Sequence, residues 1–168
     1  RKRFFYPATS FTYKNHQILL EAFKILGDKG FNDYEVLFTI KENENKYTLQ
    51  LAEYAKENNL NIKFNGPIKR AKVFEIYTKS VLLFPSFVES FGLPLLEARL
   101  SDTFIIANKT SFAEEILKDY ENSLFFNGDK ALELASCIEK MSLIKYCKPK
   151  EIKFENENKS LVDLCISL

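Results

Sequence analysis

Short apolar segments alternate with longer amphipathic segments along most of this chain. The short segments are almost continuously apolar, which is typical of parallel strands that are buried on both faces of a sheet. The longer segments repeat apolar residues at helical spacing, as Ile18, Leu19, Ala22 and Phe23 do within residues 16–26. This alternation indicates βαβ units with right-handed connections. We therefore expect an α/β fold, a Rossmann-like parallel sheet of about six strands with helices on both faces.

The expected domain runs from residue 1 to residue 142, and residues 143–168 are expected to form a linker and a C-terminal helix. That last segment would pack on the same domain or toward a preceding one. Asn15 and Asp129 each stand where an N-cap side chain would begin a helix. The expected strands are residues 3–8, 34–40, 61–65, 81–84, 103–107 and 123–126, and the expected helices are residues 16–26, 47–58, 71–79, 112–117 and 129–141, with a further helix that starts near Pro94.

Composition excludes several classes of protein. The 168 residues carry a formal net charge of +1 and their basic residues are scattered, so nothing points to nucleic acid as a partner. Cys137, Cys147 and Cys165 show no metal-ligand spacing, and no secretory segment is evident, which predicts a reducing cytoplasm. No apolar run approaches the roughly 20 residues that cross a bilayer.

Residues 85–98, with the sequence PSFVESFGLPLLEA, are the most informative about function. They follow an apolar strand, contain Gly92, and place Pro94 in the first turn of a helix. The unpaired amides and the dipole of a helix start favour an anion such as a phosphate. Glu89 and Glu97 would flank that anion and suit hydroxyls of a ribose or a sugar. The alternative is that Glu89 is a solvated loop charge and Glu97 an exposed helix residue.

This segment resembles the signature of the retaining, nucleotide-sugar-dependent glycosyltransferases of family 4, which have the GT-B fold. The signature has two glutamates separated by seven residues, with Phe-Gly-Leu-Pro between them, as Glu89 and Glu97 are here. The resemblance covers nearly all of the chain and implies the C-terminal, donor-binding half of such an enzyme. A complete GT-B enzyme has two Rossmann-like domains, so we expect the isolated chain to fold but to transfer no sugar.

The resemblance also implies a role for each residue of the segment. Glu89 would accept hydrogen bonds from hydroxyls of the donor sugar, and Glu97 from the ribose hydroxyls. The backbone amides of Phe91, Gly92 and Leu93 would face the sugar and the diphosphate, while their side chains are expected to pack. An ionised carboxylate accepts two hydroxyl donors well, so the physical chemistry agrees with these roles.

Other loops contribute further candidates. Lys14 follows the first strand and is implied to bind the diphosphate, which makes Lys14 and Glu89 the expected catalytic residues; a solvated loop lysine is the alternative. Gly66 and Ile68 follow another strand and would lie against the nucleotide base, unless they form a plain turn. Ser86 is expected either to contact a phosphate or to cap its turn.

The chain departs from the family pattern in two places. The family carries a Gly-Arg pair before its lysine, and Pro7 and Ala8 stand there instead, so that arginine is absent. Lys69 and Arg70 are candidates to replace it. Residues 100–104 lack the family's usual Gly and Pro, so we expect a loop of different shape.

The only histidine, His16, suggests a general base. We reject this role, because general-base and acceptor-side groups of the fold belong to the other domain. Packing at the helix start, or a hydrogen bond to the loop, is the expected role instead. Glu114 and Glu115 match the family's glutamate after the next strand, and we interpret them as capping and helix-dipole residues.

The implied reaction moves a sugar from a nucleoside diphosphate sugar to an acceptor hydroxyl with retention, as a hexosyltransferase does. The Tyr-Pro-Ala…Lys-Asn-His loop resembles a bacterial surface-polysaccharide subgroup, which suggests synthesis of capsule, O-antigen or lipopolysaccharide. No cofactor and no metal are expected. The partners would be the donor and, through an N-terminal domain, a saccharide or lipid-linked acceptor at the inner face of the membrane. The alternative is an inactive nucleotide-binding or interaction module; a phosphorylase-type GT-B enzyme would need a pyridoxal lysine, which we cannot identify.

Overall fold

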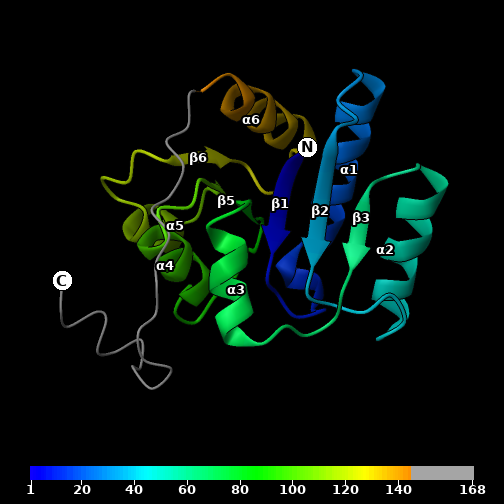
Figure 1. Cartoon of the computed structure of the whole chain (residues 1–168), viewed down its shortest axis with the longest axis horizontal. Helices are drawn as coiled ribbons and strands as arrows, with labels where there is room; N and C mark the ends of the chain where they lie inside the picture. Colours follow the sequence, from blue (N-terminus) through cyan, green and yellow to red (C-terminus); the bar gives the residue numbers. More distant parts are fainter. Residues whose placement is uncertain (145–168) are drawn as a thin grey trace.

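Six parallel strands form the centre of the computed structural model, which describes residues 1–144 (Figure 1). Their order is β3-β2-β1-β4-β5-β6, and each neighbouring pair is parallel. The predicted fold class, a Rossmann-like sheet of about six strands, is confirmed. The strands are β1 (Lys2–Tyr6), β2 (Tyr34–Phe38), β3 (Ile62–Phe64), β4 (Val81–Phe84), β5 (Ile105–Asn108) and β6 (Ser123–Phe126).

Two groups of helices cover the two faces of this sheet (Figure 1). In one group α1 packs between α2 and α6, and in the other α4 packs between α3 and α5. Among residues 1–144, no helix is both long and apolar enough to span a membrane. The helices are α1 (His16–Asp28), α2 (Lys46–Glu57), α3 (Arg70–Tyr77), α4 (Leu93–Leu100), α5 (Ser111–Ile116) and α6 (Ala131–Leu143).

Burial follows the pattern that the sequence predicts. Phe4, Phe5 and Tyr6 at the end of β1 are buried in succession, as expected of a central strand covered on both faces. The predicted face of α1, which includes Leu19 and Phe23, is buried as well. Burying one such side chain contributes about 1.5–3 kcal/mol. Packing of these faces therefore holds the helices against the sheet.

The structure differs from the prediction at the starts of α1 and α6, and it shows how α4 ends without a glycine. Asn15 precedes α1 but has a left-handed backbone with a φ of 56°, and its side chain makes no capping hydrogen bond. Asp129 does not cap α6, because that helix begins later and Lys130 occupies the N-cap position. After α4, Asp102 takes a φ of 51°, and the Thr103 N–H donates to the Ala98 carbonyl. Asp102 thus makes the left-handed helix end that glycine often makes.

The predicted division between a domain and a C-terminal segment stays a prediction. Helix α6 extends to Leu143, one residue into the segment expected to be a linker. The rest of the predicted linker and the predicted C-terminal helix lie outside the described residues, as do Cys147 and Cys165. Cys137 is a buried free thiol on α6.

Candidate functional site

The strand order reverses between β1 and β4, and the loops after these two strands carry the predicted catalytic residues. Lys14 ends a short 3-10 helix, η1 (Thr12–Lys14), in the β1–α1 loop, and Glu89 lies in the β4–α4 loop. The Lys14 Nζ is 2.5 Å from the Glu89 Oε1, and the two side chains are only 13% and 12% exposed. They are therefore not a solvated lysine and a solvated glutamate. Open α/β sheets bind ligands at such a reversal of strand order.

Backbone contacts tie the same two loops together. The Phe87 N–H donates to the Tyr13 carbonyl at 3.0 Å. Ser86 is buried, and its hydroxyl donates to the Val88 carbonyl at 3.0 Å. Ser86 thus caps its own turn, which is one of the two roles expected for it, and a phosphate contact stays a prediction.

Helix α4 begins beside this ion pair. It starts at Leu93 with Pro94 in its first turn, as the sequence predicts. Gly92 precedes it with a φ of 57°, and a Cβ there would lie 2.6 Å from Ile116 Cδ1. Glycine is therefore required both by the left-handed backbone and by the close approach of α5. The first hydrogen bond of the helix runs from the Leu95 N–H to the Gly92 carbonyl. The backbone N–H groups before Leu95 therefore make no hydrogen bond within the helix.

The expectation that the Phe91 and Leu93 side chains pack is wrong. They are 77% and 46% exposed, because the first buried residue of α4 is Leu95 and these two positions precede it. On the facing loop, Phe11 and Tyr13 are also exposed, and their rings stack at 5.4 Å. Exposed apolar side chains thus flank the Lys14–Glu89 pair on both loops.

Glu97 lies one turn into α4 and is 8% exposed, so it is not the exposed helix residue of the alternative interpretation. Its Oε1 is 2.7 Å from Nη2 of Arg70, at the start of α3, and its Oε2 accepts a 3.4 Å hydrogen bond from the Tyr77 hydroxyl. Burial raises the pKa of Glu97, and the Arg70 charge acts in the opposite direction. Arg70, a candidate for the absent arginine, therefore neutralises Glu97 here, while Lys69 occupies the N-cap position of α3.

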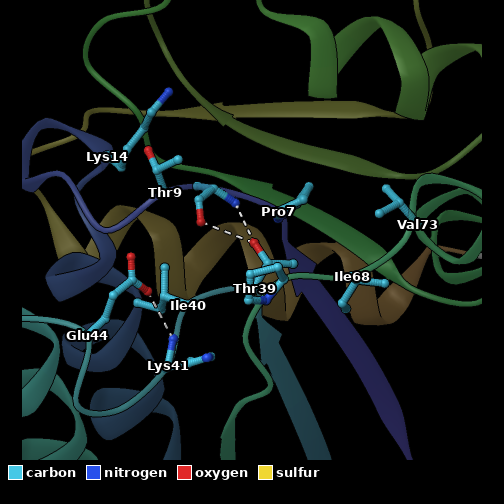
Figure 2. Close-up of a pocket in the computed structure, with 11 residues that line it drawn as sticks. Pro7, Thr9, Lys14, Thr39, Ile40, Lys41, Glu44, Ile68 and Val73 are labelled. Atoms are coloured by element: carbon cyan, nitrogen blue, oxygen red, sulfur yellow. Dashed lines mark hydrogen bonds between the residues drawn. The ribbon is translucent and has the colours of Figure 1, made fainter.

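A cavity of about 550 Å³ opens beside Lys14 at the carboxyl ends of β1 and β2 (Figure 2). Ile68 lines it, as expected of the loop after β3. Gly66 is not among its lining residues; it has a φ of 77°, and a Cβ there would be 3.0 Å from the Cγ of Lys41, which does line the cavity. The predicted residues Lys14 and Ile68 thus line the same cavity. Gly66 contributes because the absence of a side chain there leaves room for Lys41.

The lining residues that sequence reasoning missed include three polar ones from the loop after β2, which are Thr39, Lys41 and Glu44. The Thr39 hydroxyl accepts from the Ala8 N–H at 3.0 Å and donates to the Ala8 carbonyl at 3.1 Å. Dashed lines at Thr39 in Figure 2 mark these hydrogen bonds. The Glu44 carboxylate accepts from the Ser10 hydroxyl at 2.9 Å and from the Lys41 N–H at 3.2 Å. Their position directly after β2 was the available signal, because the carboxyl ends of parallel strands share one edge.

His16 has the expected packing role at the start of α1. Its ring is fully buried and lies 4.8 Å from the ring of Tyr6 and 5.1 Å from that of Phe38. Among the described residues, neither ring nitrogen has a hydrogen-bond partner, so the alternative of a bond to the loop is not seen. Burial, and then the charge of Lys14, lower the pKa of His16 to about 3. An imidazole that is so weakly basic and is enclosed by other side chains is unsuited to general-base chemistry.

Glu114 and Glu115 are exposed and neither caps α5. The cap is Thr110, whose hydroxyl accepts from the Ala113 N–H at 3.4 Å. Glu114 lies in the first turn, where its charge suits the helix dipole, so the capping interpretation is wrong and the dipole interpretation fits Glu114. Within residues 1–144, no cluster of three His, Cys, Asp or Glu side chains could hold a metal ion.

Comparison with protein families gives one match. The family model described as Glycosyl transferases group 1 matches residues 1–159 of this chain. No curated protein matches the sequence.

Solved structures share the fold. A glycosyltransferase from Rickettsia africae ESF-5 matches with a TM-score of 0.74 and 20% identity, over 84% of this chain and 37% of that one. Anabaena HepE, in complex with UDP and glucose, matches with a TM-score of 0.72 and 20% identity, over 84% and 38%. The catalytic domain of a cholesterol-α-glucosyltransferase from Helicobacter pylori matches with a TM-score of 0.67 and 16% identity, over 84% and 87%. The chain thus spans less than two fifths of the first two proteins, and at these identities the likeness shows the fold alone.

Proposed function

This chain belongs to the glycosyl transferases group 1 family, and we propose that it is the donor-binding half of a retaining glycosyltransferase of family 4 with the GT-B fold. The whole enzyme would act as a hexosyltransferase, moving a sugar from a nucleoside diphosphate sugar to an acceptor hydroxyl. The observation that carries the proposal is the meeting of Lys14 and Glu89 at the reversal of strand order, beside the start of α4. The cation and the helix N-terminus at this place suit the diphosphate of such a donor, and the carboxylate suits the hydroxyls of its sugar.

Lys14 would bind the diphosphate, and Glu89 would accept hydrogen bonds from the donor sugar. An ammonium has three N–H donors, so Lys14 can hold Glu89 and a phosphate oxygen at once. Bonds between charged groups of this kind are shorter and stronger than neutral ones. The buried Lys14–Glu89 pair would thus hold the negative leaving group beside Lys14 and the sugar hydroxyls beside Glu89.

Glu97 would accept from the ribose hydroxyls, and the cavity lined by Ile68 would hold the base, with Gly66 shaping its wall. Glu97 is already bonded to Arg70 through Oε1. A ribose would share the carboxylate with Arg70 or displace the guanidinium, which is exposed enough to swing into solvent.

The departing diphosphate would be stabilised electrostatically by Lys14 and by the amides at Phe91, Gly92 and Leu93, rather than by a metal or a cofactor. These donors act on charge that grows as the bond to the sugar breaks, so they favour the transition state over the ground state. Ser86 would hold the loop that presents them.

The partners follow from the same assignment. HepE is similar in fold and is described with UDP and glucose, which supports a nucleotide-sugar donor for this chain. The acceptor, a saccharide or a lipid-linked saccharide, would be bound by an N-terminal domain at the cytoplasmic face of the membrane. Synthesis of capsule, O-antigen or lipopolysaccharide is the pathway class that we propose.

A second candidate is a nucleotide-binding module without transfer activity. The observation that favours it is that both carboxylates are occupied, Glu89 by Lys14 and Glu97 by Arg70, while Ala8 replaces the family's arginine. Such a module would bind a nucleoside diphosphate and its sugar ester equally well.

Calorimetry with UDP, GDP, ADP and CDP, and with their glucose esters, separates these candidates. We expect one nucleoside diphosphate to bind, and its sugar ester to bind more tightly. Glu97→Gln should weaken binding of the ribonucleotide about 10- to 150-fold, with a smaller effect on its 2′-deoxy form. Glu89→Gln should remove the advantage of the sugar ester. If no nucleotide binds, the proposed function is wrong; if Glu89→Gln leaves the ratio unchanged, Glu89 does not bind the sugar.

A further inference from the structure

Two side chains outside the roles assigned so far hold the turn that carries Lys14. One is Tyr6, the last residue of β1, which is completely buried. Its hydroxyl donates a 2.7 Å hydrogen bond to the carbonyl of Lys14. The rings of His16 and Phe84 lie 4.8 and 6.1 Å from the Tyr6 ring, so packing on several sides fixes the direction of this hydroxyl. Tyr6 thus anchors the Lys14 turn from within the sheet.

Asn15 anchors the same turn from the other side. Its Nδ2 donates to the Gly128 carbonyl at 2.7 Å and to the Pro85 carbonyl at 3.4 Å. Gly128 lies in the β6–α6 loop and Pro85 in the β4–α4 loop, so one amide links three loops at the ligand edge. The left-handed backbone of Asn15 alone would suit glycine better. The side-chain amide, rather than the backbone conformation, is therefore what asparagine adds here.

These anchors matter because Lys14 and Glu89 come from loops that are 75 residues apart in sequence. A lysine stem is flexible, so its ammonium has a defined place only when both ends are held. Glu89 holds the Nζ of Lys14 at one end, and the turn must hold its backbone at the other. Displacements of about 1 Å at such groups weaken binding and catalysis severely. We propose that Tyr6 and Asn15 are positioning residues of the donor site: together they fix the Lys14 turn against the β4–α4 loop and so set the affinity for the diphosphate. This inference rests on the proposed function of Lys14.

A merely structural role predicts something different. If Tyr6 and Asn15 only stabilise the fold, their loss lowers the free energy of unfolding but leaves the relative affinities for a nucleoside and its diphosphate unchanged. If they position Lys14, the loss falls on the diphosphate alone. It also disappears once Lys14 has been removed, because nothing is left to position.

The test uses Tyr6→Phe and Asn15→Gly, with Tyr34→Phe as the matched control. Tyr34 is also buried, and its hydroxyl accepts from the Asn61 N–H at 3.4 Å. It is the first residue of β2, however, so it lies at the amino end of the strands, away from the Lys14 turn at their carboxyl ends. Calorimetry would compare whichever of UDP, GDP, ADP and CDP the wild type binds with the corresponding nucleoside. Each site variant should weaken diphosphate binding about 3- to 10-fold, as loss of one neutral hydrogen bond predicts, with less than a twofold change for the nucleoside.

The same substitutions in a Lys14→Ala background should have no further effect on diphosphate affinity. Persistence of the loss in that background, or an equal loss for nucleoside and diphosphate, would overturn the inference while leaving the proposed function intact. If the wild type binds none of the four diphosphates, the proposed function fails, and the inference with it. Should Tyr6→Phe not fold, Asn15→Gly decides the matter, since glycine accepts the backbone conformation at that position.

Discussion

Acid should destabilise this domain through His16, and a His16→Leu substitution should remove that part of the loss. The His16 ring is enclosed by Tyr6, Phe38 and Tyr47, at centroid distances of 4.8, 5.1 and 6.5 Å. Protonation would put a charge into this apolar site, close to the ammonium of Lys14. For that reason the pKa of His16 falls from 6.5 to about 3 on folding.

The sign and size of the effect follow from this difference in pKa. Because the folded pKa lies below the unfolded value, the unfolded chain binds the proton more readily. The contribution of His16 to stability is complete above pH 6.5 and is lost as the pH falls toward 3. From pH 6.5 to pH 4.5 it amounts to two pH units at about 1.36 kcal/mol each, a loss of roughly 3 kcal/mol.

Urea denaturation of the wild type and of His16→Leu at several pH values between 7.5 and 4.5 measures this directly. At pH 7.5 the variant should be as stable as the wild type or more so, because it replaces an imidazole that has no hydrogen-bond partner within residues 1–144 by an apolar group of similar size. At pH 4.5 the variant should have gained about 3 kcal/mol relative to the wild type. Parallel stability curves for the two proteins would refute the reasoning, since they would mean that His16 titrates normally.

Two further predictions concern α4. Gly92→Ala should lower the free energy of unfolding by about 2–4 kcal/mol, because the added Cβ is strained in a left-handed backbone and clashes with Ile116. Thermal denaturation checks this. A variant as stable as the wild type would mean that α5 moves to remove the clash. Burial raises the pKa of Glu97, so its stabilising contribution is present below about pH 4.5 and is lost as the pH rises through the folded pKa. The stability of the wild type relative to Glu97→Gln should therefore grow as the pH falls from 7 to 4.5, and a difference independent of pH would contradict that.

The sequence was sufficient to predict the sheet and to place Lys14 and Glu89 at the same end of it. Apolar runs bounded by turn residues predicted β4 and β6 at their observed positions. β4 lies inside the sheet and is mostly buried, as a continuous apolar run indicates, whereas β6 is the edge strand and is only partly buried. The convergence of Lys14 and Glu89 could also be expected, since each follows a strand and parallel strands end at one edge. Periodicity and topology carry information of this kind.

Contacts that depend on how elements pack could not be predicted in this way. Asparagine before a helix signals an N-cap, yet the amide of Asn15 binds carbonyls that are 70 and 113 residues away in sequence. The bond from Arg70 to Glu97 depends on how the start of α3 lies against α4, which spacing does not define. In each case the packing of the elements determines which partner the side chain contacts, and local sequence does not.

The most direct test of the proposed donor site is the effect of Lys14→Ala on binding of a nucleoside diphosphate and of its nucleoside. Lys29→Ala is the matched control, since Lys29 also bears an ion pair but lies at the other end of α1. Calorimetry should show that Lys14→Ala weakens diphosphate binding about 10- to 150-fold, the range for hydrogen bonds to charged groups, while nucleoside affinity and the Lys29 control stay as in the wild type. An equal loss for both ligands, or no loss for either, would contradict the account, because Lys14 would then not lie at the diphosphate.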